Sequence, residues 1–232
     1  MRQATAAVGM LDRVRACLLL LVLLAGCGTA PAPPPVSSGS AATAPGTFRS
    51  TSRPLSTGWK ITVYYTAVEE FHHDDPVPVT GCPRLDCENG DDHLGEYPES
   101  FVNAVEAEGT GKTLSGRFLN WSYDTGFWLD DAPRASDGGS LTPFVSAAAD
   151  PGVLPQGTGF TIADCGRQED GSAPPAAVCA RLRKAEWRIS DEFTPGLGGS
   201  RHVDAYIGPE TGPGFTESEW YLTLENAKLA VG

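Results

Sequence analysis

The sequence predicts a mainly β domain, folded as a barrel or a sandwich. Short segments rich in β-branched and aromatic residues recur along the chain, and glycine and proline separate them. Only one segment, near the C-terminus, has a helical pattern. Many short strands with Gly- and Pro-rich turns in one domain are typical of these two architectures.

The expected strands follow one another along the chain. The clearest is WKITVYYTA at residues 59–67, where β-branched and aromatic side chains alternate with period two. Further strands are expected at residues 100–107, 115–123, 126–131, 144–150, 157–165, 180–190 and 201–208, with 115–123 and 126–131 as a hairpin. A short C-terminal helix is expected from Thr216, with acidic residues in its first turn and apolar residues through Leu229.

The N-terminus indicates export. Arg13 and Arg15 precede a short apolar run that ends in Leu-Ala-Gly and then Cys27. This pattern resembles a bacterial lipoprotein signal, so residues 1–26 would be removed and Cys27 would carry the lipid. An ordinary secretory signal or an uncleaved anchor is the alternative. We therefore expect an exported lipoprotein, anchored to the membrane through Cys27 and facing the cell wall.

Residues 27–56 are rich in Pro, Ala, Ser, Thr and Gly, which predicts a disordered tether behind the lipid. Residues 57–232 are enough for one domain with a core. Without residues 1–26, which hold three Arg and one Asp, the chain keeps 14 basic and 28 acidic residues, a net charge of −14. Such acidity argues against a nucleic-acid partner.

Four cysteines lie in the expected domain, and an even number in an exported domain favours disulfides. Proximity along the chain suggests the pairs Cys82–Cys87 and Cys165–Cys179, out of three possible pairings.

Three aspartates near the C-terminus lie at expected strand ends or turns. Asp150 stands in AAADPGVLPQGTGFTI, Asp191 in RISDEFTPG and Asp204 in GGSRHVDAYIG. Carboxylates gathered in one site raise each other's pKa, which suits acid catalysis. Asp150 before Pro151 is also a common turn former, and structural work is its alternative role.

These strings resemble the 3D, or three-aspartate, domain family. The resemblance depends on DPGVLPQGT, on the strand that ends in Asp191, and on the Gly-rich turn into RHVDAY. The opening VYYTA is similar to the first strand of such domains. This resemblance implies a six-stranded double-psi β-barrel with long loop insertions, related to the membrane-bound lytic transglycosylase A group.

The resemblance also implies cleavage of peptidoglycan glycan strands by a single acid. Asp191 matches the residue implied as general acid/base, Asp204 the residue beside it, and Asp150 the first aspartate of the family. One group would protonate the glycosidic oxygen and then accept the proton of the MurNAc C6 hydroxyl, which requires a raised pKa. The turn after Asp191 is longer than in the family, and Glu192 is either a second acid or a surface charge.

Five aromatic residues lie near expected strand ends, where a ring stacks on sugar or packs in the core. We name Tyr65, Trp121 and Trp128 as candidate glycan contacts, and the other two are Tyr64 and Tyr123. The segments FHHDD at residues 71–75 and DDH at 91–93 contain residue types that bind metals. An acidic loop of an exported protein, without a metal site, is the simpler interpretation. We therefore expect no metal and no cofactor.

Two functional classes remain open from the sequence. The first is an anchored, peptidoglycan-cleaving enzyme. The second is a non-catalytic, expansin-like module that binds peptidoglycan or another polysaccharide, which the longer turn after Asp191 favours. A weaker third possibility is a wall-associated structural lipoprotein whose site has decayed.

Overall fold

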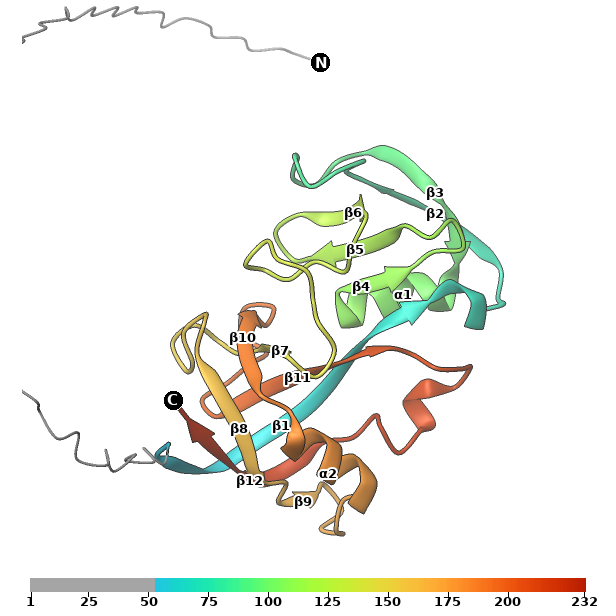
Figure 1. The fold of residues 1–232 in the computed structure, drawn as a ribbon. Helices are drawn as coiled ribbons and strands as arrows, with labels where there is room; N and C mark the ends of the chain where they lie inside the picture. Colours follow the sequence, from blue (N-terminus) through green and yellow to red (C-terminus); the bar gives the residue numbers. More distant parts are fainter. Residues whose placement is uncertain (1–52) are drawn as a thin grey trace, which may run out of the picture. The chain divides into compact units, whose positions relative to one another are not determined.

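The computed structural model describes residues 53–232, and six strands in this part close into a barrel (Figure 1). Around the barrel, β1 pairs with β11, then β7, β10, β8 and β12, and β12 pairs back with β1. Their bounds are β1 Leu55–Val68, β7 Ser146–Ala148, β8 Gly159–Asp164, β10 Trp187–Asp191, β11 His202–Pro209 and β12 Leu224–Val231. The prediction of a mainly β, six-stranded barrel is confirmed.

The predicted signal, the lipid site Cys27 and nearly all of the predicted tether lie outside the described residues. The first barrel strand begins at Leu55, two residues before the domain boundary expected at residue 57. Within residues 53–232, no helix has the length and apolar character needed to cross a membrane.

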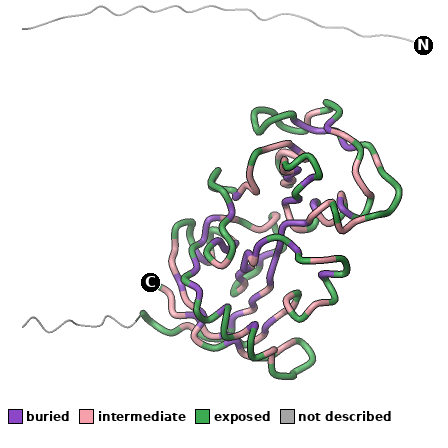
Figure 2. The backbone as a smooth tube through the Cα atoms, turned by 45° about the vertical axis from the view of Figure 1, so that its right-hand side comes forward, coloured by how far each residue is buried: buried purple, intermediate pink, exposed green. Residues whose placement is uncertain are grey.

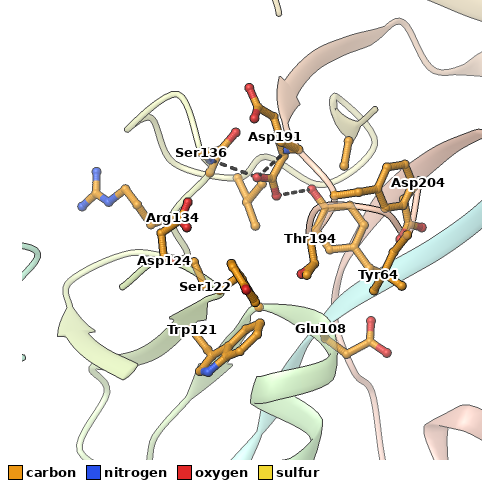
Figure 3. A pocket seen from close by; sticks show the side chains of 18 of the residues that line it. Tyr64, Glu108, Trp121, Ser122, Asp124, Arg134, Ser136, Asp191, Thr194 and Asp204 are labelled. Atoms are coloured by element: carbon orange, nitrogen blue, oxygen red, sulfur yellow. Dashed lines mark hydrogen bonds between the residues drawn. The ribbon is translucent and has the colours of Figure 1, made fainter. Parts of the chain in front are cut away.

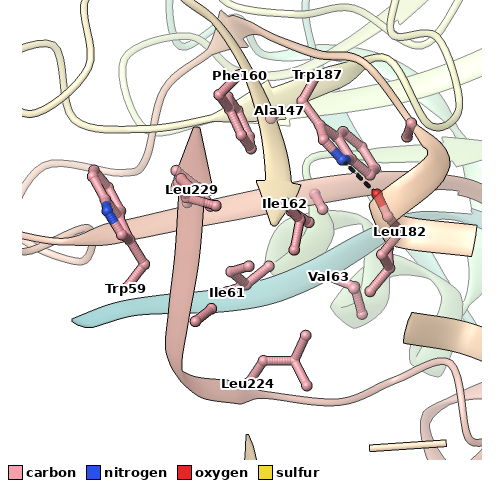
Figure 4. Packing of buried hydrophobic residues seen from close by; sticks show 14 of the residues in the cluster. Trp59, Ile61, Val63, Ala147, Phe160, Ile162, Leu182, Trp187, Leu224 and Leu229 are labelled. Atoms are coloured by element: carbon pink, nitrogen blue, oxygen red, sulfur yellow. Dashed lines mark hydrogen bonds between the residues drawn. The ribbon is translucent and has the colours of Figure 1, made fainter. Parts of the chain in front are cut away.

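The main core fills the barrel. In β1, Trp59, Ile61 and Val63 alternate inward, because successive side chains of a strand point to opposite faces. They meet side chains from β8, β10, β12 and helix α2 (Ala176–Lys184), including Ile162 and Trp187 (Figure 4). The tube in Figure 2 shows buried residues recurring along these strands, while the connecting loops are largely exposed.

A second region is inserted between β1 and β7 and has its own core. It contains the 3-10 turn η1 (Glu69–Phe71), β2 (Pro76–Gly81), β3 (Asp92–Pro98), α1 (Glu99–Glu108), β4 (Thr110–Lys112), β5 (Phe118–Ser122) and β6 (Gly126–Asp130). Strand β4 pairs with the last residues of β1, so β1 belongs to both regions. The predicted hairpin of residues 115–123 and 126–131 is confirmed as β5 and β6.

The prediction of a strand at residues 100–107 is wrong, because α1 occupies this segment. Phe101 and Val105 are one helical turn apart, and both are fully buried on the same face. Gly109 ends the helix in the left-handed conformation, at a φ of 84°. The i, i+4 spacing and the following glycine were the helix signals in the sequence.

The expected strand at residues 180–190 is half helix. Helix α2 (Ala176–Lys184) buries Val178 and Leu182, and β10 begins only at Trp187. The indole of Trp187 donates a hydrogen bond to the carbonyl of Leu182 at 3.1 Å, which joins the two elements (Figure 4).

The predicted C-terminal helix is wrong. Only the 3-10 turn η2 (Phe215–Glu217) forms near its expected start, and the apolar residues that follow lie in β12. Strand β12 pairs on one side with β1 and on the other with β8. Closing the barrel satisfies the backbone groups of three strands at once, and this outweighs a local helix preference.

Both suggested disulfides are confirmed. Cys82–Cys87 closes the loop after β2, and Cys165–Cys179 links the residue after β8 to α2. The short strand β9 (Arg167–Gln168) lies within the second of these loops and pairs with β12.

Candidate active site

Barrel pairing places two of the three aspartates on one row. Asp204 on β11 is in register with Ala148 on β7, and Asp191 on β10 is in register with the same Ala148. On the other side of β11, Asp204 is in register with Thr62 on β1. Neighbouring strands lie about 4.8 Å apart, so the Cα atoms of the aspartates are about 10 Å apart on one face.

This row forms the floor of a groove of about 570 Å³. Its walls come from the end of α1, the β5–β6 hairpin, the loop at residues 134–141 and the loop at residues 192–197. Figure 3 shows Asp191, Asp204, Tyr64 and Glu108 around the same space. The barrel and the inserted region both contribute side chains to the groove.

Three donors fix the carboxylate of Asp191. The backbone N–H groups of Ser136 and Glu192 donate to Oδ1 at 2.9 and 3.0 Å, and the Tyr64 hydroxyl donates to Oδ2 at 3.1 Å (Figure 3). Burial raises the pKa of Asp191, and it outweighs these hydrogen bonds, which favour the charged form. Asp191 is therefore both oriented and inclined to hold a proton.

Asp204 differs from Asp191 in having few partners. Its Oδ1 is buried and accepts no hydrogen bond within the described part of the chain. Burial, together with the charge of Asp191, raises the pKa of Asp204 to about 7. Because an unpaired buried anion is costly, a large fraction of Asp204 still holds its proton near neutral pH.

Asp150 does not line the groove. Its backbone carbonyl accepts hydrogen bonds from the N–H groups of Val153 and Leu154, as in a turn. Its carboxyl lies directly beneath Gly198, where an added Cβ would come within 2.4 Å of it. The structure places Asp150 outside the row of Asp191 and Asp204, because strand β7 ends before it and Asp150 begins the following turn.

His202 supports the loop that follows Asp191. Its Nε2 and the Thr62 hydroxyl are 2.8 Å apart, and its Nδ1 lies 3.0 Å from the carbonyl of Gly198. The ring of Phe193 packs on the imidazole with centroids 4.5 Å apart. Burial lowers the pKa of His202, so the ring is neutral and structural near neutral pH.

Of the three aromatic residues named from the sequence, Trp121 and Trp128 line the groove, and Tyr65 does not. Tyr65 is buried against Phe215, with ring centroids 4.8 Å apart. Its neighbour Tyr64 lines the groove instead, because adjacent residues of β1 face opposite sides. The choice of Tyr65 over Tyr64 is corrected.

Two groove residues escaped the sequence analysis. Glu108 is the last residue of α1, and recognising that helix would have placed its carboxyl at an element end. Arg134 is bound to Asp130, with Nε to Oδ2 at 3.0 Å, and its Nη1 donates to the carbonyl of Gly138 at 3.0 Å. Arg134 thereby fixes the loop whose Ser136 N–H reaches Asp191.

Among residues 53–232, no three His, Cys, Asp or Glu side chains are arranged to hold a metal ion. In the FHHDD segment, His72 lies between Ser100 Oγ at 2.8 Å and Glu210 Oε1 at 3.0 Å. Glu210 is itself buried and accepts the N–H of Val68. This cluster ties the inserted region to the end of β11.

No protein-family model matches the sequence, and the comparison with curated proteins gives no match either. Among solved structures, the chain is similar to E. coli MltA with bound chitohexaose, at 15% identity over 75% of this chain and 71% of that chain, with a TM-score of 0.48. It is also similar to a membrane-bound lytic murein transglycosylase from Agrobacterium tumefaciens, at 11% identity, 75% and 73% coverage and a TM-score of 0.46. A third is the lytic transglycosylase LtgG of Burkholderia pseudomallei, at 14% identity over 75% of this chain and 72% of that chain, with a TM-score of 0.42. At identities this low, the similarity concerns the fold alone.

Proposed function

We propose that this protein cleaves the glycan strands of peptidoglycan, with Asp191 as the single general acid/base. One observation carries the proposal: Asp191 and Asp204 lie on one row at the floor of a groove large enough for sugar rings, and burial raises the pKa of both. The three-aspartate pattern of the sequence points to the same chemistry.

The reaction needs one proton carrier and no water. The neutral carboxyl of Asp191 protonates the oxygen that joins MurNAc C1 to the next GlcNAc, and the C1–O bond breaks. The MurNAc C6 hydroxyl then attacks C1, and its proton returns to the Asp191 carboxylate. The products are a 1,6-anhydro-MurNAc end and a free GlcNAc hydroxyl, so atoms and charges balance.

The neighbours of Asp191 have separate tasks in this scheme. The N–H groups of Ser136 and Glu192 and the hydroxyl of Tyr64 stabilise the carboxylate formed after proton transfer. Asp204 shares the groove floor with Asp191, and the charge of Asp191 raises the pKa of Asp204, so the two carboxyls do not both ionise readily near neutral pH. Trp121 is partly exposed and offers apolar surface for sugar rings at the wall of the groove, whereas Trp128 lines the groove but is almost fully buried.

The exported location belongs to the same proposal. A lipid on Cys27 and a tether that ends before β1 begins at Leu55 would hold the domain above a membrane, facing its substrate in the cell wall. The domain would reach glycan strands within the length of the tether.

The test uses purified domain and peptidoglycan sacculi, with mass spectrometry for anhydro-muropeptides. We expect release by the wild type, and a loss of at least about 100-fold in Asp191→Asn. Asp150→Asn is the matched control, since Asp150 lies outside the groove, and it should retain most activity. Release that persists in Asp191→Asn would exclude this residue as the acid.

The runner-up function is a polysaccharide-binding module without turnover. The loop after Asp191 favours it, because this loop is longer than in the three-aspartate family and its residues Phe193 and Leu197 line the groove. Co-sedimentation with sacculi and no anhydro products would support this function over cleavage.

A further inference from the structure

Glu108 brings a third carboxyl to the groove, from the opposite region of the chain. Asp191 and Asp204 belong to barrel strands, whereas Glu108 ends helix α1 of the inserted region. All three line the same groove, and Figure 3 shows the Glu108 side chain near Tyr64 and Asp204. Glu108 has no part in the proton transfers proposed above.

Two hydrogen bonds hold the carboxyl of Glu108 in place. The backbone N–H of Tyr65 donates to Oε2 at 3.3 Å, and the hydroxyl of Tyr221 donates to Oε1 at 3.2 Å. Within residues 53–232, no Lys, Arg or His forms an ion pair with Glu108. The carboxyl is thus fixed without a cation to stabilise its charge.

Burial, with the charges of Asp204 and Glu210 acting in the same direction, raises the pKa of Glu108 to about 8. The N–H of Tyr65 and the hydroxyl of Tyr221 work in the opposite direction. These groups face Glu108 from β1, β11 and the segment before β12. At neutral pH, Glu108 is therefore mainly a neutral carboxylic acid.

A neutral Glu108 leaves one hydrogen without an acceptor. Glu108 and Tyr221 then carry two hydroxyl hydrogens, but a single hydrogen bond joins them. Oε2 accepts from Tyr65 and faces no other acceptor within the described residues. A donor at the groove wall needs an acceptor from a bound molecule, because an unsatisfied donor is costly once water is displaced.

We propose that Glu108 is a specificity residue that donates a hydrogen bond to the acetamido carbonyl of an N-acetylated sugar in the groove. A carbonyl oxygen is an acceptor only, and it carries no charge that the nearby carboxylates would repel. A sugar with a hydroxyl in place of the acetamido group lacks this acceptor. The inference rests on the proposed function only in that the groove must hold a glycan.

The experiment compares two neutral β-1,4 hexasaccharides, one of N-acetylglucosamine and one of glucose. Binding is measured by calorimetry at pH 6 in the Asp191→Asn background, so that no bond is cleaved. We expect this background to prefer the N-acetylated hexamer, and Glu108→Ala to lower the preference by about 10-fold. Glu108→Gln keeps an N–H donor at the same place and should retain most of the preference.

Two further arms separate a direct contact from a structural role. Between pH 6 and pH 9.5 the preference should fall while Glu108 is present, because the donor ionises, and it should stay constant in Glu108→Gln. Glu99→Ala, at the exposed start of α1, is the matched control and should change nothing. Thermal unfolding of each variant shows whether it has folded.

The proposal is overturned if Glu108→Ala keeps the full preference, if Glu108→Gln loses as much as Glu108→Ala, or if the background binds neither hexamer. Cleavage of sacculi is a separate readout. A Glu108-dependent preference without anhydro products would leave this inference standing and remove the lytic function. Anhydro products, together with a preference for the N-acetylated hexamer that does not depend on Glu108, would support the lytic function and rule out the role proposed for Glu108.

Discussion

The hydroxyl of Tyr64 is the one side-chain donor to Asp191 from β1, and it sets how readily that acid ionises. Tyr64 is buried, and its ring packs on Tyr206 with centroids 5.2 Å apart. The hydrogen bond to Asp191 favours the carboxylate, so it holds down a pKa that burial raises. At the scale of single residues, the acid is tuned by two opposed effects.

Tyr64→Phe should shift this balance. Losing the donor raises the pKa of Asp191, so the fall of activity on the alkaline side should move to higher pH, and the maximal rate should drop about 10-fold. The pH–rate profile on sacculi measures both effects. Tyr206→Phe is the control, because the Tyr206 hydroxyl bonds Thr66 rather than Asp191. The fall of activity at high pH should not move in this variant. An unchanged fall of activity at high pH in Tyr64→Phe would contradict the role given to this hydrogen bond.

Arg134 acts on the site through its loop. Arg134→Ala frees the turn that presents the Ser136 N–H to Asp191, so the maximal rate should fall by about 10-fold with little change in KM. Steady-state kinetics on a soluble glycan separates the two constants. Lys228→Ala breaks an exposed ion pair with Asp164 on the barrel, and it should leave both constants unchanged. Equal losses in the two variants would argue against a positioning role.

At the scale of elements, α1 depends on one glycine in the neighbouring strand. Gly111 of β4 lies against Phe101 and Val105, and an added Cβ would approach their side chains to 2.6 and 2.4 Å. Both residues are fully buried, so neither has free space into which to move. This contact brings the end of α1, and with it Glu108, against β1.

Gly111→Ala should therefore lower the free energy of unfolding by about 1–3 kcal/mol through overpacking. Chemical denaturation of the purified domain measures it. Gly212→Ala is the control, because its added Cβ would meet nothing within 4 Å, and the change should be under about 0.5 kcal/mol. A Gly111→Ala domain of full stability would show that the core around α1 relaxes freely.

The helices and strands differ in how well they could be predicted from the sequence. Strands β1, β5, β6 and β11 were predicted from short segments rich in β-branched and aromatic residues, a local signal that needs no knowledge of the partner strands. The segment of helix α1 had the i, i+4 spacing of apolar residues that indicates a helix, but it was short enough to be taken for a strand. Strand β12 had a helix-like sequence, and only its two partner strands made it extended.

At the scale of the whole molecule, buried carboxyls make stability depend on pH. Burial raises the pKa of Asp204 to about 7 and that of Glu108 to about 8, whereas both ionise near pH 4 in an unfolded chain. Between about pH 4 and 8 the folded protein binds more protons, so its stability falls as pH rises through this window. The lowered pKa of His202 acts in the opposite direction over a narrower range.

We therefore expect a higher Tm at pH 5 than at pH 8.5. The double variant Asp204→Asn, Glu108→Gln should flatten this dependence and raise the Tm at pH 8.5 by about 5 °C. Differential scanning calorimetry at several pH values measures it. A Tm that rises steadily from pH 5 to pH 8.5 in the wild type would show that these two acids are not held neutral.

The sequence by itself indicated the β class, suggested the two disulfides and singled out Asp191 and Asp204, which line one groove, because these depend on local residue patterns, chain proximity and a recognisable string around each acid. Tertiary structure alone decided the rest. The end of strand β7 left Asp150 outside the row, strand alternation placed Tyr64 rather than Tyr65 at the groove, and packing of the inserted region brought Glu108 to the groove. The physical reason is that a groove is formed by elements far apart in the chain, and their contacts leave no local signal in the sequence.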